Sequence, residues 1–295
     1  VRAVPEGSRV MVDEVQRLPN LLNEVHRAIE TGCYRFVLSG SSSRKLKRSG
    51  VNLLAGRAIR KTMHPFVPCE LKGDFNLDEV LQFGTIPTVW QAEDKALTLE
   101  ACAQMYLREE IQAEALVRNL PSFARFLPVA ALMHGQVLNV SGAARDCGSH
   151  RNTVSSYIEI LEDTLVAFRL PGYEAKLRVK ERKHPKLYFM DPGLVRVLKK
   201  NTGSISVEEK GSLFEGWIAS VLRAHNAYQN LFDDWYYWSS SESKAEVDFL
   251  LRRADRFIAI EVKSSKVFRF GTGLLSAKDC EAACNYIKRL KPNGQ

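Results

Sequence analysis

A strand–helix–strand pattern near the start of the sequence is the feature that most constrains the fold. Residues 9–12 form a short apolar run that ends in Asp13 and Glu14. The spacing of apolar residues predicts an amphipathic helix over 19–29, and residues 35–38 form a second short strand. This order is typical of parallel strands in an α/β sheet, whose carboxyl ends are where such sheets bind ligands.

The polar residues at the two strand ends have the chemistry of a nucleotide site. The first carboxylate, Asp13, can help to hold Mg²⁺, and Glu14 can orient or deprotonate an attacking water. Ser39 and Ser41 follow the second strand, where a hydroxyl can sense a γ-phosphate. Taken alone, the Asp-Glu pair is better explained as a helix cap beside a flexible serine loop. The combination of both strand ends favours the nucleotide site.

A phosphate-binding loop is missing from the printed sequence. The chain has 295 residues and 18 glycines, and none of these glycines is followed by lysine. A G-x-x-x-x-G-K-[ST] loop, whose backbone N–H groups and lysine hold the phosphates, is therefore absent from it.

The middle of the chain predicts a helical lid followed by a winged helix. Helices are expected within 90–134, including 97–117 and 122–134, because the segment is rich in Ala, Leu, Glu and Gln. Residues 139–154 have helix–turn–helix character, with Gly148 in the turn. Two wing strands are expected at 166–170 and 187–190.

A basic stretch lies between these expected wing strands, in a chain of net charge +8. Four cationic side chains of this stretch alternate with other residues and would lie on one face of an extended segment. Such a face suits a phosphate backbone. These residues are Lys176, Arg178, Lys180 and Arg182. The second helix offers polar residues at its N-terminus, where recognition helices read base edges. A protein-contact role for the winged helix is the alternative. The candidate nucleic-acid-binding residues are His150, Arg151, Asn152, Lys176, Arg178, Lys180 and Arg182.

The C-terminal part carries a second group of candidate catalytic residues. Asp248, Glu261 and Lys263 form the pattern D-x12-E-x-K across two expected strands, 246–251 and 257–263. Two carboxylates in one pocket need a cation between them, and Mg²⁺ takes oxygen ligands. A neighbouring lysine can orient the hydroxide that attacks a phosphodiester. A surface hairpin with a Glu–Lys pair, and a fold that binds without cutting, are the alternatives.

The N-terminal motifs resemble a bacterial and archaeal family of predicted AAA-type ATPases. The resemblance rests on residues 10–16, 36–41 and 53–57 and extends over the whole chain. It implies that Asp13 and Glu14 match the Walker B carboxylates and that Ser39 or Ser41 matches the first sensor. It also implies a truncated member, whose first strand and phosphate loop lie upstream of residue 1.

The C-terminal motif resembles the PD-(D/E)xK nuclease superfamily. This resemblance implies that Asp248 and Glu261 are metal ligands and that Lys263 is catalytic. Glu215, on an expected helix over 213–222, matches a third acidic residue. Arg108 resembles an AAA-family position from which an arginine can reach a neighbouring subunit's phosphate in a homo-oligomer, although a solvated surface arginine is the simpler interpretation.

Together these patterns predict an α/β multidomain protein. A partial P-loop AAA-type core is expected over 1–84, a helical lid and winged helix over 85–204, and a restriction-endonuclease-like α/β domain over 205–295. The expected function is that of an ATP-binding AAA-type ATPase family protein acting on nucleic acid, with Mg²⁺ as cofactor and hydrolysis in doubt for this chain. A Mg²⁺-dependent nuclease and a non-enzymatic binding module are the alternatives.

The composition adds an expectation about location. No run approaches the roughly 18 apolar residues of a membrane helix, and the sequence does not begin like a secretory signal. The six cysteines show no C-x-x-C pair and are expected to be reduced. We therefore expect a cytoplasmic protein that does not act at a membrane.

Overall fold

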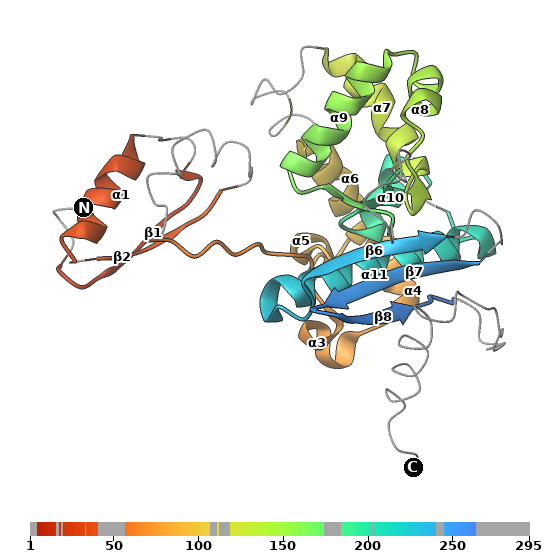
Figure 1. The fold of residues 1–295 in the computed structure, drawn as a ribbon. Helices are drawn as coiled ribbons and strands as arrows, with labels where there is room; N and C mark the ends of the chain where they lie inside the picture. The colour runs from red at the N-terminus through yellow and green to blue at the C-terminus, as the bar shows by residue number, and fades with distance from the viewer. Residues whose placement is uncertain are drawn as a thin grey trace. The chain divides into compact units, whose positions relative to one another are not determined.

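The computed structural model describes residues 5–15, 18, 20–32, 34–40, 57–106, 111, 119–173, 184–201, 203–239 and 245–263. The chain divides into two compact units, one of residues 1–61 with 159–166 and the other of 62–158 with 167–295. Both helices and small sheets are present (Figure 1), which agrees with the predicted α/β class.

The strand–helix–strand order predicted for the N-terminal segment is confirmed. Strand β1 (Arg9–Val12) and strand β2 (Arg35–Leu38) pair in parallel, and helix α1 (Leu21–Glu30) connects them. In this register Val12 lies opposite Leu38, so both strands end at the same edge of the sheet. The residues that follow the two strands are therefore neighbours.

Helix α1 packs its apolar stripe on one face of this two-stranded sheet. Leu22 and Val25 are fully buried, and they cluster with Val12, Phe36 and Leu38. Burial of each large aliphatic side chain contributes about 1.5–3 kcal/mol. The contact between helix and sheet thus holds α1, β1 and β2 together as one small unit.

The second unit contains most of the helices. The first group comprises α3 (Pro68–Leu71), the 3₁₀ helix η3 (Lys72–Asp74), α4 (Leu77–Phe83), α5 (Pro87–Trp90), α6 (Lys95–Met105) and α7 (Leu120–Leu132). The side chains of Asp94 and Asn119 cap the N-termini of α6 and α7, satisfying backbone N–H groups that have no partner within the helix. Among the described residues, no helix has the length and apolar character needed to cross a membrane.

A three-stranded antiparallel sheet follows, in the order β3-β5-β4. Strands lie at the two positions where strands were expected, as β4 (Ala167–Leu170) and β5 (Lys186–Phe189). The third strand, β3 (Gln136–Val137), was not predicted, because two residues are too few to show alternation. Helices α8 (Val140–Asp146) and α9 (Arg151–Asp163) lie between β3 and β4 in the chain.

The C-terminal sheet is antiparallel, in the order β6-β7-β8, and helix α11 (Val207–Gln229) packs against it (Figure 1). Its strands are β6 (Asp234–Ser239), β7 (Glu246–Arg253) and β8 (Arg256–Ile260). The core they share with the preceding sheet contains Phe168, Leu170, Tyr188, Ala219, Phe232, Tyr237, Phe249 and Leu251.

Backbone hydrogen bonds also join the two antiparallel sheets. Tyr237 of β6 donates its N–H to the carbonyl of Pro171, 3.0 Å away, and its own carbonyl accepts from the N–H of Tyr173 at 2.7 Å. These bonds hold β6 beside the segment that follows β4, so residues that are widely separated in the sequence lie close together.

The last strand is shorter than predicted. It was expected to extend to Lys263, with Glu261 and Lys263 on one face of a strand, but β8 ends at Ile260. The N–H of Val262 donates instead to the carboxylate of Asp248, with a nitrogen–oxygen distance of 2.7 Å. A side chain has replaced the backbone ladder at this point, so Glu261 and Lys263 follow the strand.

Helix α10 (Pro192–Leu198) is fixed in place by a buried carboxylate. Asp191 is fully buried, and its oxygens accept from the N–H of Leu194 at 3.2 Å and from that of Thr85 at 2.6 Å. Gly84 and Gly193 make this approach possible, since an added Cβ would lie 1.8 Å from Asp191 Oδ1 or 2.1 Å from the carbonyl oxygen of Phe83. The start of α10 is therefore tied to the end of α4.

Candidate functional site

The end of the parallel sheet brings Asp13 and Ser39 together. The hydroxyl of Ser39 donates a hydrogen bond to Oδ1 of Asp13. Backbone hydrogen bonds continue the pairing past the strands, with Ser39 N–H to Val12 O at 2.9 Å and Val15 N–H to Ser39 O at 3.1 Å. Two of the residues predicted for a nucleotide site are therefore in direct contact.

Glu14 begins the turn away from this sheet edge. Its φ of 50° lies in the left-handed region, which few non-glycine residues occupy and which recurs where a local conformation serves a function. Glu14 is half-buried, whereas Asp13 is exposed. Adjacent carboxylates in different environments are suited to different roles. Ser41 and Arg108 lie outside the described residues.

The candidate nucleic-acid residues are described only in part. His150, Arg151 and Asn152 are exposed at the start of α9. Gly148, with a φ of 62°, makes the turn that separates α8 from α9, a conformation that glycine adopts without strain. The basic stretch with Lys176, Arg178, Lys180 and Arg182 lies outside the described residues.

A buried polar cluster lies where β5, α11 and β7 meet. Oε1 of Glu215 accepts from the ammonium of Lys186 at 3.1 Å and from the hydroxyl of Tyr188 at 2.5 Å. The same ammonium lies 2.7 Å from Oε1 of Glu246. Asp248 is close enough to interact electrostatically with these groups. Glu215, Glu246 and Asp248 are called the acidic cluster below.

The environment shifts the pKa of three groups around this acidic cluster. Burial, together with the nearby Glu215 and Glu246, raises the pKa of Asp248 to about 6, although the hydrogen bond from Val262 opposes the shift. Burial lowers the pKa of Lys186, but its two glutamate partners outweigh burial and the net shift is upward. The pKa of Tyr188 is raised by burial and by Glu215. Shifted pKa values are typical of functional sites, although structural ion pairs also produce them.

The position of Lys186 corrects the sequence interpretation. Lys186 lies at the end of the basic stretch between the two expected strands, but only 5% of its surface is exposed and it is paired with glutamates. Sequence reasoning thus missed Lys186, Tyr188 and Glu246 as members of the site. A signal was present, because Lys186 directly precedes the apolar run Leu187-Tyr188-Phe189, and a lysine beside a buried strand needs a partner.

The predicted metal ligands do not form one coordinating group. Glu261 pairs with Lys263, and more than half of each side chain is exposed; this pairing raises the pKa of Lys263. Within the described part of the chain, no set of three or more His, Cys, Asp or Glu side chains is arranged to hold a metal ion. Between the carboxylates of Glu215 and Glu246 lies the ammonium of Lys186. The described residues therefore show no ready-made Mg²⁺ site, and no metal-assisted step is assigned to them.

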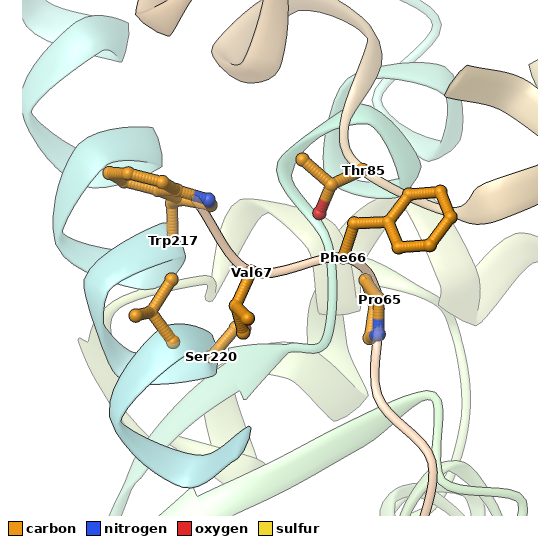
Figure 2. A pocket seen from close by; sticks show the side chains of 7 residues that line it. Pro65, Phe66, Val67, Thr85, Trp217 and Ser220 are labelled. Carbon is orange, nitrogen blue, oxygen red and sulfur yellow. The ribbon is translucent and has the colours of Figure 1, made fainter. Parts of the chain in front are cut away.

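Two cavities among the described residues lie away from these sites. Figure 2 shows one of about 10 Å³ between residues 65–67, Thr85 and the helix segment 217–221, which is room for about one water molecule. A larger cavity of about 230 Å³ is lined by residues of α4, α6 and α10. Neither is lined by a predicted site residue.

Comparison with protein families gives matches over three parts of the chain. Residues 2–72 match a family described as an AAA domain. Residues 74–204 and 210–288 match two domains of unknown function, DUF8612 and DUF4143. The matches at the two ends support an AAA-type family, and the first of them suggests an ATPase-like one.

Two mycobacterial proteins are similar over most of the chain. The uncharacterized protein Rv2008c of Mycobacterium tuberculosis and the uncharacterized protein Mb2031c of Mycobacterium bovis are each 24% identical over 276 residues, or 91% of this chain. The match covers 61% of each relative, so the chain spans about three fifths of their length. No solved structure gives a significant match.

Proposed function

We propose that residues 5–40 form the Mg²⁺- and water-positioning half of an ATP site in an AAA-type ATPase. The observation that carries the proposal is the hydrogen bond from Ser39 to Asp13 across the ends of two parallel strands. The AAA-domain match over the same residues supports it.

Each residue has a separate role in this proposal. Asp13 would hold Mg²⁺, which neutralises charge on the phosphates when it is bound. Ser39 fixes the orientation of the Asp13 carboxylate through its hydrogen bond and would also contact the γ-phosphate. Glu14 would orient the attacking water and accept its proton.

The proposal requires a phosphate-binding loop from outside the printed sequence, because none of its glycines is followed by lysine. We expect the gene to encode a G-x-x-x-x-G-K-[ST] loop ahead of this segment. Failure to find such a loop, in frame or in an adjacent frame, would contradict an ATPase.

The role of Asp13 can be tested by nucleotide binding to the full-length protein. Asp13→Asn should weaken ATP binding in the presence of Mg²⁺ by roughly tenfold or more, about 1.4 kcal/mol, and should leave binding in EDTA unchanged. Glu24→Gln is a matched control, since Glu24 lies on α1 in an exposed ion pair with Arg27. Equal Mg²⁺-dependent binding by Asp13→Asn and wild type would refute the assignment.

For the second unit we propose nucleic-acid contact through the start of α9. The chain order α7, β3, α8, α9, β4, β5 and the sheet order β3-β5-β4 support a winged helix with α9 as its recognition helix. The exposed His150, Arg151 and Asn152 are suited to base-edge or phosphate contact.

Fluorescence anisotropy with a short labelled DNA duplex tests this second proposal. Arg151→Ala should weaken binding about tenfold at low salt, and wild-type binding should fall as salt rises. Arg256→Ala, which changes an exposed arginine in the C-terminal hairpin, should bind like wild type. If Arg151→Ala also binds like wild type, α9 is not the contact.

A further inference from the structure

Lys186 is a buried cation held by carboxylates from two other elements. It lies at the start of β5, while Glu215 lies on α11 and Glu246 on β7. Its side chain is 6% exposed, against 19% for Glu215 and 49% for Glu246. Removing an ammonium group from water is costly unless it is paired and hydrogen-bonded. The two glutamates supply that pairing.

The surroundings hold this ammonium group in a defined position. Tyr188, on the same strand, donates to the Glu215 oxygen that Lys186 also contacts. The ring of Tyr237 lies 5.6 Å from the Lys186 nitrogen, within range of a cation–π contact. Lys186 therefore has neighbours on several sides and is not a surface side chain that happens to fold inward.

The ammonium group of Lys186 lies between Glu215 and Glu246, where a metal ion that bridged these two carboxylates would also have to lie. Carboxylates that share a pocket repel one another unless a cation lies between them. A divalent ion that joined Glu215 to Glu246 would lie beside the ammonium that contacts their Oε1 atoms at 3.1 and 2.7 Å, and the two cations would repel each other.

We propose that Lys186 is the built-in cation of the acidic cluster and that its ammonium group keeps divalent metals out of the site. The cluster then joins β5 to α11 and β7 without a metal, and removal of the lysine charge uncovers a site for a hard divalent cation. This inference is independent of the proposed nucleotide site in the other unit.

The wild-type protein provides the first test, through titration of the full chain with Mn²⁺ followed by electron paramagnetic resonance. We expect wild type and Asp248→Asn to bind Mn²⁺ equally weakly at every concentration. A Mn²⁺ site in wild type that Asp248→Asn abolishes would overturn the proposal. This result does not depend on the folding of any lysine variant.

The second test removes the ammonium. Lys186→Met should gain one Mn²⁺ site that binds at least about tenfold more tightly than any in wild type, and Lys186→Met/Asp248→Asn should lose it again. Lys210→Met is the matched control, because Lys210 pairs with Asp78 outside the acidic cluster, and it should bind like wild type. A folded Lys186→Met with wild-type Mn²⁺ binding would also overturn the proposal. If Lys186→Met does not fold, the comparison of wild type with Asp248→Asn decides the matter.

Discussion

Gly216 on α11 shows how one residue allows two elements to pack closely. A Cβ added there would lie 1.9 Å from Nε2 of His134, a histidine that is itself 2% exposed. His134 accepts a hydrogen bond from the N–H of Phe189 at 3.1 Å, and burial lowers its pKa to about 3, so it is neutral. The imidazole has little freedom to move aside.

We expect Gly216→Ala to lower the free energy of unfolding by about 1–3 kcal/mol. Alanine is the better helix former by roughly 1 kcal/mol, but the clash outweighs that gain because the neighbour is a fixed, buried ring. Urea unfolding followed by tryptophan fluorescence measures the change. Gly73→Ala, whose added methyl group would meet nothing within 4 Å, is the control. A Gly216→Ala variant more stable than wild type would contradict the close contact between α11 and the imidazole of His134.

Lys186 leads to a second prediction about a single residue. Lys186→Met should lower the free energy of unfolding by about 3 kcal/mol, because it leaves a mostly buried Glu215 without its ammonium partner. Lys186→Met/Glu215→Gln should recover part of this loss, since the uncompensated charge is removed. Thermal unfolding of both variants checks the prediction, and a double variant less stable than the single one would contradict it.

Sequence reasoning at this scale succeeded for residues whose partners lie at neighbouring strand ends. Asp13 and Ser39 were predicted to lie close together because two strands joined by a helix pair in parallel, and their hydrogen bond confirms this. Lys186 was misinterpreted because it follows closely after the basic residues Arg182 and Lys183 in the sequence. Its partners, Glu215 and Glu246, lie on other elements, and no local pattern identifies a contact over that separation.

At the scale of elements, the N-terminus of α10 depends on one buried carboxylate. Burial raises the pKa of Asp191 to about 6, although four backbone N–H groups oppose the shift. The ordinary value is 3.8. Between these two values the folded state keeps a proton that the unfolded state releases, so the contribution of Asp191 to stability falls as the pH rises from 4 to 6.

This titration predicts a pH-dependent difference between wild type and Asp191→Asn. Wild type should lose up to about 3 kcal/mol relative to the variant between pH 4 and pH 7. The lowered pKa of His134 makes the folded protein more stable as the pH rises. Wild type and Asp191→Asn share this effect, so it cancels when the two proteins are compared. Urea unfolding at a series of pH values measures the difference. A difference that stays constant with pH would contradict the raised pKa.

The elements themselves were predictable where periodicity was long or turn signals were clear. Strands β1, β2, β4 and β5 lie where apolar runs placed them, to within a residue. Helix α10 was missed, although Asp191 and Pro192 are suitable N-cap and first-turn residues. The end of β8 could not be read from sequence, because a side chain on another strand ends its hydrogen-bond ladder.

At the scale of the whole molecule, the two units carry different chemistry. The first unit holds Asp13 and Glu14 at the edge of the parallel sheet. The second unit holds the exposed residues at the start of α9 and the acidic cluster. The predicted domain limits 1–84, 85–204 and 205–295 stay a prediction. They were drawn from motifs, and the order of motifs along a chain does not determine which segments pack into one unit.

The turnover of ATP by Glu14→Gln tests the central claim most directly. Glutamine keeps the shape of the side chain but cannot accept the proton of the attacking water. In the full-length protein we predict that Glu14→Gln still binds ATP and hydrolyses it at least about 100-fold more slowly than wild type, while Glu24→Gln hydrolyses at the wild-type rate. A Glu14→Gln protein that turns over ATP as fast as wild type would contradict the assignment of this sheet edge as the nucleotide site.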